Sequence, residues 1–157
     1  MIIKRFSQLE NVVLDKIVEK HYTHWSQFSE YMNFSDTNDK FYNLYANDDN
    51  IPYGIAMFDK DNLIGFCVFK NNCLEKYSQF SPWISDVMIF DEYRGKGYGS
   101  LLIDYAKKEL KSKGFSKAYL WTDKAPLFYE KIGFKYVQDV IKNNDDGVGR
   151  LYVCDLN

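Results

Sequence analysis

The chain has 157 residues and a formal net charge of −2, and 46% of its residues are apolar. This length fits a single domain spanning residues 1–157, and the apolar content is enough for a sizeable core. The charge argues against nucleic-acid binding, which usually needs a basic stripe. The lack of an apolar run of about 18–20 residues argues against a membrane span.

The cysteine pattern bears on the compartment. Cys67, Cys73 and Cys154 have neither disulfide-like nor metal-like spacing. An odd number of cysteines without a secretory leader suggests a reducing compartment, so we expect a cytoplasmic protein without a metal site.

The N-terminal third is predicted to begin with a short strand, residues 2–6. The Ser-Gln-Leu-Glu sequence at residues 7–10 indicates a capping box at the start of an amphipathic helix. Ile17 and His21 fall on one face of this helix, which is expected to end between residues 21 and 25.

Two less regular segments follow. Residues 25–32 are predicted to form a second short helix, and residues 35–50 a polar loop with some local order. A histidine pair, His21 and His24, would then lie near a helix end, most simply in solvent.

The rest of the chain is predicted to alternate strands with two helices. Residues 59–62 carry the turn signal of a hairpin, Gly114 marks the end of one helix, and Pro126 the start of the other. The predicted strands are 53–58, 63–70, 83–90, 118–121, 134–141 and 148–154, and the predicted helices are 101–110 and 126–132.

A glycine-rich segment, residues 94–100 with the sequence Arg-Gly-Lys-Gly-Tyr-Gly-Ser, lies between a predicted strand and a predicted helix. Glycines let the backbone approach a ligand, and a helix N-terminus adds unpaired N–H groups. This layout favours phosphate binding. A dinucleotide fingerprint would need a glycine where Ser100 stands, and the Gly-Lys-Ser/Thr ending of a P-loop is missing.

A third pattern, Arg/Gln-x-x-Gly-x-Gly/Ala, is matched in full by Arg94, Gly97 and Gly99. Residues 128–134, Phe-Tyr-Glu-Lys-Ile-Gly-Phe, match a second segment one strand and one short helix later. On these two motifs, and over about residues 55–153, the chain resembles the GNAT superfamily of acyl-coenzyme A N-acyltransferases.

The resemblance implies an α/β (α+β) fold with a mixed, mostly antiparallel sheet of about six to seven strands and helices on both faces. It implies acetyl-CoA as the acyl donor and direct attack by a primary amine. The strand before the loop would pair with the pantetheine arm, and one of its N–H groups would polarise the thioester oxygen. The implied cofactor-binding residues are Val87, Met88, Ile89, Arg94, Gly95, Lys96, Gly97, Tyr98, Gly99, Ser100 and Thr122.

Two residues are candidates for catalysis. Tyr129 stands where the family often has a tyrosine that protonates the leaving thiolate, although it could instead be a packed aromatic. A phenol with a pKa near 10 can donate to a thiolate whose thiol has a pKa near 8.5. Asp86 could accept the proton of the amine or contact the substrate, or it could simply lie at a strand bend. Trp83 occupies a position where the family often has a polar group, so a base carried over from the family is in doubt.

The acceptor is less well defined. Low-priority substrate contacts are Trp25, Phe28, Glu30 and Trp83, and further candidate bases are His21 and His24. Acidic residues would favour a cationic amine, or would form solvated loops: Glu30, Asp36, Asp39, Asp48, Asp49, Asp145 and Asp146.

We expect a small-molecule or peptide amine as partner, with a homodimer as one option. The rival of a different class is a non-catalytic acyl-CoA-binding module. A toxin acting on charged transfer RNA fits the negative charge poorly.

Overall fold

The protein is described by a computed structural model that covers residues 1–48 and 50–157. The strands of these residues form one hydrogen-bonded sheet in the order β1-β2-β3-β4-β5-β7-β6. Their bounds are β1 Ile2–Arg5, β2 Tyr53–Asp59, β3 Asn62–Lys70, β4 Trp83–Ile89, β5 Lys117–Thr122, β6 Lys135–Ile141 and β7 Val148–Asp155.

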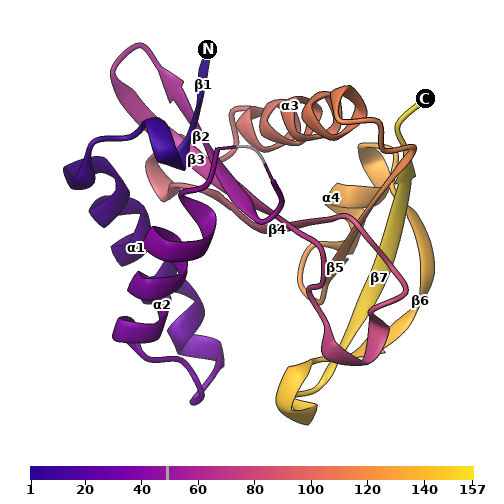
Figure 1. Cartoon of the computed structure of the whole chain (residues 1–157). Helices are drawn as coiled ribbons and strands as arrows, with labels where there is room; N and C mark the ends of the chain where they lie inside the picture. Colours follow the sequence, from indigo (N-terminus) through magenta and orange to yellow (C-terminus); the bar gives the residue numbers. More distant parts are fainter. Residues whose placement is uncertain (49) are drawn as a thin grey trace. The chain divides into compact units, whose positions relative to one another are not determined.

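Strand direction agrees with the predicted mixed sheet. β4 and β5 run parallel, whereas β1–β2, β2–β3, β5–β7 and β6–β7 run antiparallel. The helices are α1 Asn11–Trp25, α2 Phe34–Lys40, α3 Tyr98–Ser112 and α4 Pro126–Lys131 (Figure 1). The predicted fold class is therefore confirmed, and so is the predicted order of strands and helices from β2 onward.

The chain forms two compact units, and each is described by itself. Unit 1 comprises Met1–Phe69 and Asp86–Gly99, and unit 2 comprises Lys70–Ser85 and Ser100–Asn157. The prediction of one domain across residues 1–157 stays a prediction.

Unit 1 has an aromatic core. Residues of α1, among them Ile17 and Val18, pack with Phe66 of β3 and with Phe41, and all four are essentially inaccessible to solvent. The Phe6 ring stacks on Phe41 with centroids 5.7 Å apart. Burial of these large side chains gives unit 1 most of its stability, at roughly 1.5–3 kcal/mol for each fully buried side chain.

The local predictions for the N-terminal third need three corrections. α1 begins at Asn11 after Glu10, and the predicted capping box fails because residues 6–8 form a 3₁₀ turn. In that turn Gln8 Oε1 accepts from Arg5 N at 2.9 Å, while the Ser7 hydroxyl donates to Asp48. The helix predicted for residues 25–32 is only a 3₁₀ turn, Ser26–Phe28.

The third correction concerns residues 35–50, which are mostly helical instead of a polar loop. Asn33 caps α2 by accepting from Asp36 N at 2.9 Å, and a π-helical turn, Phe41–Tyr45, follows directly. Phe41 and Tyr45 are buried in the unit 1 core. The four-residue spacing of Phe41 and Tyr45 is typical of a helix, but the polar residues around them make the segment resemble a loop in the sequence. α1 and α2 lie side by side (Figure 1).

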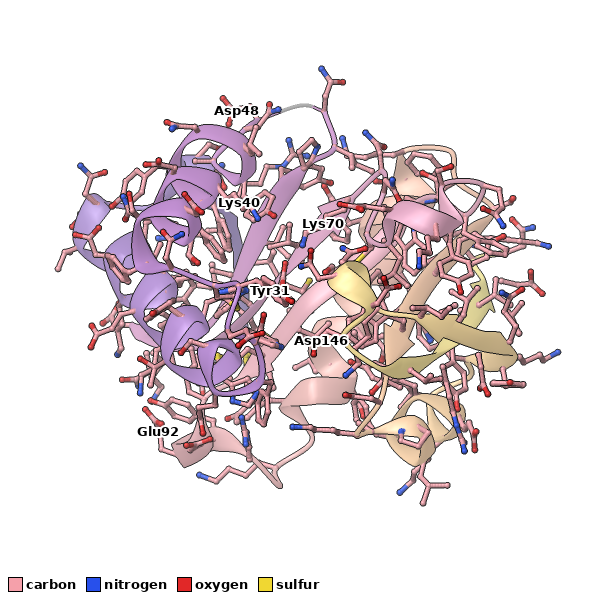
Figure 2. All side chains as sticks on the ribbon, turned by 90° about the horizontal axis from the view of Figure 1, so that it is seen from below. Tyr31, Lys40, Asp48, Lys70, Glu92 and Asp146 are labelled. Atoms are coloured by element: carbon pink, nitrogen blue, oxygen red, sulfur yellow. The ribbon has the colours of Figure 1, made fainter. Side chains whose placement is uncertain are left out.

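Unit 2 has a smaller apolar cluster built on Trp83, Leu74, Val140 and Leu151. Charged side chains lie outside the cores of both units: Lys40 and Glu92 in unit 1 and Asp146 in unit 2 are exposed (Figure 2). No helix of the described residues is long and apolar enough to cross a membrane.

Candidate active site

The glycine-rich segment follows β4 after a 3₁₀ turn, Asp91–Tyr93, and leads directly into α3. Gly95 and Gly97 have φ values of +73° and +85°, the left-handed region that side chains disfavour. No atom lies within 4 Å of where a Cβ would stand at either glycine. The segment therefore combines a left-handed backbone, open space and a helix N-terminus, which is the arrangement that binds phosphate.

Side chains of the same segment hold its shape. Arg94 Nε donates to Ile89 O at 2.9 Å, and its Nη1 lies 3.1 Å from Asp91 Oδ1. Lys96 Nζ donates to Glu92 O at 3.3 Å. Arg94 therefore orders the loop through its contacts with Ile89 and Asp91.

The start of α3 is tied to the β2–β3 hairpin. The Tyr98 hydroxyl donates to Asp59 Oδ2 at 3.3 Å. Partial burial, together with this carboxylate, raises the pKa of Tyr98 above its usual value, so the phenol stays protonated. Gly99 and Ser100 continue the first turn of the helix.

β4 contains a backbone irregularity at its centre. Asp86 has a φ of +51°, which is rare for a residue with a side chain and least costly for Asp and Asn. Val87, Met88 and Ile89 follow it, and Met88 is the buried one of the three. A conformation of this kind costs of order 1–3 kcal/mol and is found mainly where function requires it.

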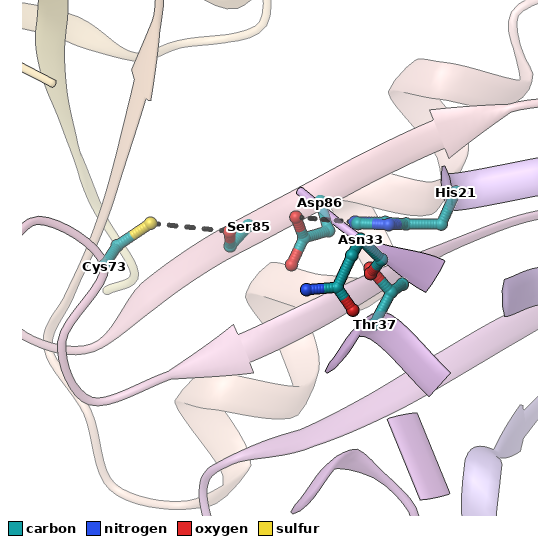
Figure 3. A network of polar contacts seen from close by, with 6 residues as sticks. All are labelled: His21, Asn33, Thr37, Cys73, Ser85 and Asp86. Atoms are coloured by element: carbon teal, nitrogen blue, oxygen red, sulfur yellow. Dashed lines mark hydrogen bonds and ion pairs between the residues drawn. The ribbon is translucent and has the colours of Figure 1, made fainter. Parts of the chain in front are cut away.

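Asp86 is held by a histidine from α1. His21 Nε2 lies 3.1 Å from Asp86 Oδ1 (Figure 3). His21 is buried, with its ring against Trp25 at 4.4 Å and Phe41 at 4.8 Å between centroids. The expectation of a solvent-exposed histidine pair is therefore wrong for His21.

The sequence carried a signal for this burial. His21 lies four and three positions after Ile17 and Val18, which are buried on the same face of α1. A histidine that continues an apolar stripe needs a polar partner inside the protein, but the sequence does not indicate which residue supplies it.

Tyr129 belongs to α4 in unit 2. It is half-buried, and its ring packs edge-on against Phe128 and Phe134 at 5.0 and 5.8 Å between centroids. The next residue, Glu130, accepts a 2.8 Å hydrogen bond from the hydroxyl of Tyr152, which is fully buried on β7. This bond fixes α4, and therefore Tyr129, to the sheet of unit 2.

The remaining predicted residues differ in accessibility. The hydroxyl of Thr122 accepts from Ala125 N at 3.0 Å and so supports the turn into α4.

Trp83 is fully buried and donates through Nε1 to Phe80 O at 2.6 Å. It is a core residue of unit 2, which corrects the prediction of a substrate contact. Phe28 and Glu30 are exposed and Trp25 is half-buried.

Asp49 of the predicted acidic group lies outside the described residues. Among residues 1–48 and 50–157, no group of three or more His, Cys, Asp or Glu side chains is placed to hold a metal ion.

Comparison with known proteins identifies the family. Residues 17–134, more than half of the chain, match the model described as "Acetyltransferase (GNAT) family". The chain belongs to the GNAT acetyltransferase family. The predicted family is confirmed, and N-acyl transfer from acetyl-CoA is the chemistry of that family.

Solved structures of GNAT proteins share the fold. The chain resembles aminoglycoside 6′-acetyltransferase type Ii with a TM-score of 0.75 and 23% identity, over 100% of this chain and 98% of that one. It also resembles a putative streptothricin acetyltransferase from Bacillus anthracis str. Ames, solved with acetyl coenzyme A. That match has a TM-score of 0.59 and 27% identity, over 74% of this chain and 68% of that one.

One curated relative matches locally. The uncharacterized N-acetyltransferase CgeE of Bacillus subtilis (strain 168) is 43% identical over 60 residues. The match covers 36% of this GNAT chain and 23% of CgeE. The chain thus spans about a quarter of the length of that relative.

Proposed function

We propose that this chain transfers an acetyl group from acetyl-CoA to a primary amine of a small molecule or peptide, with a cationic amine favoured. The observation that carries the proposal is the pair of left-handed glycines, Gly95 and Gly97, with open space around both and α3 starting at Tyr98. Backbone N–H groups in this arrangement would bind the diphosphate of coenzyme A.

The reaction needs one bond formed, one broken and two proton movements. The neutral amine nitrogen attacks the thioester carbon, the C–N bond forms and the C–S bond breaks. Asp86 accepts a proton from the amine, and Tyr129 donates one to the departing thiolate. The ordinary pKa values of a phenol, near 10, and a thiol, near 8.5, permit this donation.

The cationic acceptor is supported by the surface of unit 1. Glu30 is exposed and lies close in sequence to Phe28, a residue that is 49% exposed. Carboxylates and aromatic faces both attract ammonium groups. Aminoglycoside and spermidine acetyltransferases are among the proteins that share this fold, which makes polycationic amines the first compounds to test.

Two measurements test the proposal on the full chain. Calorimetric titration with CoA should show saturable binding, and free thiol should appear when acetyl-CoA is mixed with spermidine, an aminoglycoside or a peptide amine. Binding without thiol release across the amine panel would favour the acyl-CoA-binding module. A flat titration with well-folded protein at millimolar CoA would contradict both.

The role of Tyr129 has its own test. Tyr129→Phe should lower kcat by about 10²-fold, because general acid catalysis contributes at least this much, and should leave CoA affinity unchanged. Tyr136→Phe is the matched control, since Tyr136 is an exposed tyrosine of the same unit whose hydroxyl donates to Asp139. Full turnover in Tyr129→Phe would remove the role.

A further inference from the structure

A buried imidazole supports the only residue of β4 in a left-handed conformation. Asp86 has a φ of +51°, and its Oδ1 lies 3.1 Å from His21 Nε2 (Figure 3). His21 belongs to α1 and stands 65 positions earlier in the chain. A polar pair inside an aromatic core costs free energy unless its hydrogen bonds are made. Its presence therefore calls for a role beyond packing.

The two partners differ in accessibility. The side chain of Asp86 is 17% exposed and that of His21 is 9% exposed. The imidazole is enclosed by the rings of Trp25, Phe41 and Phe66, and its Nδ1 is buried with no hydrogen-bond partner among the described residues. The carboxylate is the more accessible of the two groups, so we expect a ligand to contact Asp86 and His21 to act through it.

The contacts select one tautomer of the neutral ring. With the proton on Nε2, the ring donates to Asp86 Oδ1, and only a lone pair at Nδ1 is left unpaired. With the proton on Nδ1, a buried N–H lacks an acceptor and the Nε2 lone pair faces a carboxylate oxygen. The first arrangement makes one charge-assisted bond, whereas the second loses it and strands a donor.

A third group near Asp86 does not compete for the proton. Cys67 of β3 is fully buried. Burial raises the pKa of its thiol far above the ordinary value, and the Asp86 carboxylate raises it further. Cys67 therefore stays protonated and does not compete with Asp86 as a proton acceptor.

We propose that His21 is a positioning residue, a neutral Nε2–H imidazole that fixes Oδ1 of Asp86 so that the second carboxylate oxygen takes the proton of the incoming amine. The inference rests on the proposed acetyl transfer. The neutral amine attacks the thioester carbon with its lone pair, which leaves the nitrogen positively charged. An N–H bond of that nitrogen then breaks, the proton moves to Asp86 Oδ2, and the electron pair of the broken bond stays on nitrogen. The bond from His21 also holds a backbone conformation that would otherwise relax.

The tautomer can be tested without a substrate. The full chain has two histidines, so ¹⁵N-histidine labelling and a His24→Gln variant leave one set of ring signals. Long-range ¹H–¹⁵N correlation under mildly alkaline conditions should place the ring proton on Nε2. A proton on Nδ1 would overturn the proposal.

Kinetics test the positioning role with a matched pair of amides. His21→Gln puts an amide N–H near the place of Nε2, whereas His21→Asn puts one near the place of Nδ1. We expect His21→Gln to keep kcat for spermidine within about threefold, and His21→Asn to lose roughly tenfold or more with unchanged affinity for CoA. Equal losses in both variants, or no loss in His21→Asn, would contradict the role.

A further variant separates this inference from the proposed function. Asp86→Asn tolerates the left-handed backbone and can still accept from His21, but cannot take a proton, so kcat should fall by 10²-fold or more, of the order expected for general base catalysis. If the unmodified protein binds CoA but acetylates neither spermidine nor an aminoglycoside, the proposed function has failed. In that case the position of the His21 ring proton, on Nε2 or on Nδ1, still tests the contact with Asp86 independently of the reaction.

Discussion

The glycines of unit 1 fall into two regions with opposite surroundings. In the β2–β3 hairpin, a Cβ on Gly54 would lie 2.2 Å from the Phe6 ring, and one on Gly65 would lie 2.2 Å from Met88 O. In the segment before α3, Gly95 and Gly97 have left-handed φ values and no atom within 4 Å of the Cβ position. The strand glycines are required by packing and the loop glycines by backbone conformation.

This difference separates residues that hold the fold from residues available to a ligand. A side chain at Gly65 would force β3 away from β4, and interiors at crystal-like density do not absorb such a shift. A side chain at Gly97 meets only open space, so its cost is local. The same substitution to alanine should therefore damage stability in one region and ligand binding in the other.

The largest effect is expected at Gly65. Gly65→Ala should lower the free energy of unfolding by about 3 kcal/mol, because the clash is with backbone that cannot rotate away. For a chain of this size this lowers the Tm by roughly 6–12 °C, measurable by calorimetry or circular dichroism. An unchanged Tm would show that β3 and β4 are less closely packed than described.

The loop should respond in the opposite way. Gly97→Ala should cost only about 1–2 kcal/mol of stability, from the left-handed backbone, yet weaken CoA binding by tenfold or more as the loop shifts. Gly114→Ala is the control, because Gly114 has a φ of +92° and open space at the other end of α3. Calorimetry should show that both variants lose the same stability, but that only Gly97→Ala loses CoA affinity. Equal CoA affinities in the two variants would contradict a role of the loop in CoA binding.

A smaller effect is expected from the arginine of the same loop. Arg94→Ala should weaken CoA binding by about threefold to tenfold without abolishing it, since the backbone N–H groups remain. Arg94→Lys separates the two possible causes, because lysine keeps the charge but not the fixed Nε geometry. The bond from Arg94 Nε to Ile89 O predicts that lysine will not restore affinity. Full restoration would indicate direct contact with the diphosphate.

The smallest effect on stability is expected at Tyr42, which packs against the unit 1 core. The Tyr42 hydroxyl donates to Asp15, and burial together with this bond raises the pKa of Tyr42 to about 12. Tyr42→Phe should lose roughly 0.5–1 kcal/mol. Because the folded-state pKa is raised, this contribution is complete below about pH 10 and declines as the pH rises toward 12. A stability difference that grows with pH would contradict the bond.

Several strands and the loop were predictable from local signals. Two mainly apolar runs separated by the turn at residues 59–62 predicted β2 and β3 nearly to their ends. The spacing of Arg94, Gly97 and Gly99 predicted the loop, because a left-handed backbone has few residue types available to it. α2 was missed because its buried residue is Thr37, which is polar, and the buried Phe41 comes only in the π-helical turn that follows.

The amino-acid sequence by itself determined the family, the order of strands and helices from β2 onward, and the glycine-rich loop, since each depends on residues close together in the chain. Only the tertiary structure decided that His21 meets Asp86 and that Trp83 is a core residue. A hydrogen bond between residues 65 positions apart depends on how α1 packs on the sheet, and no local pattern encodes that packing.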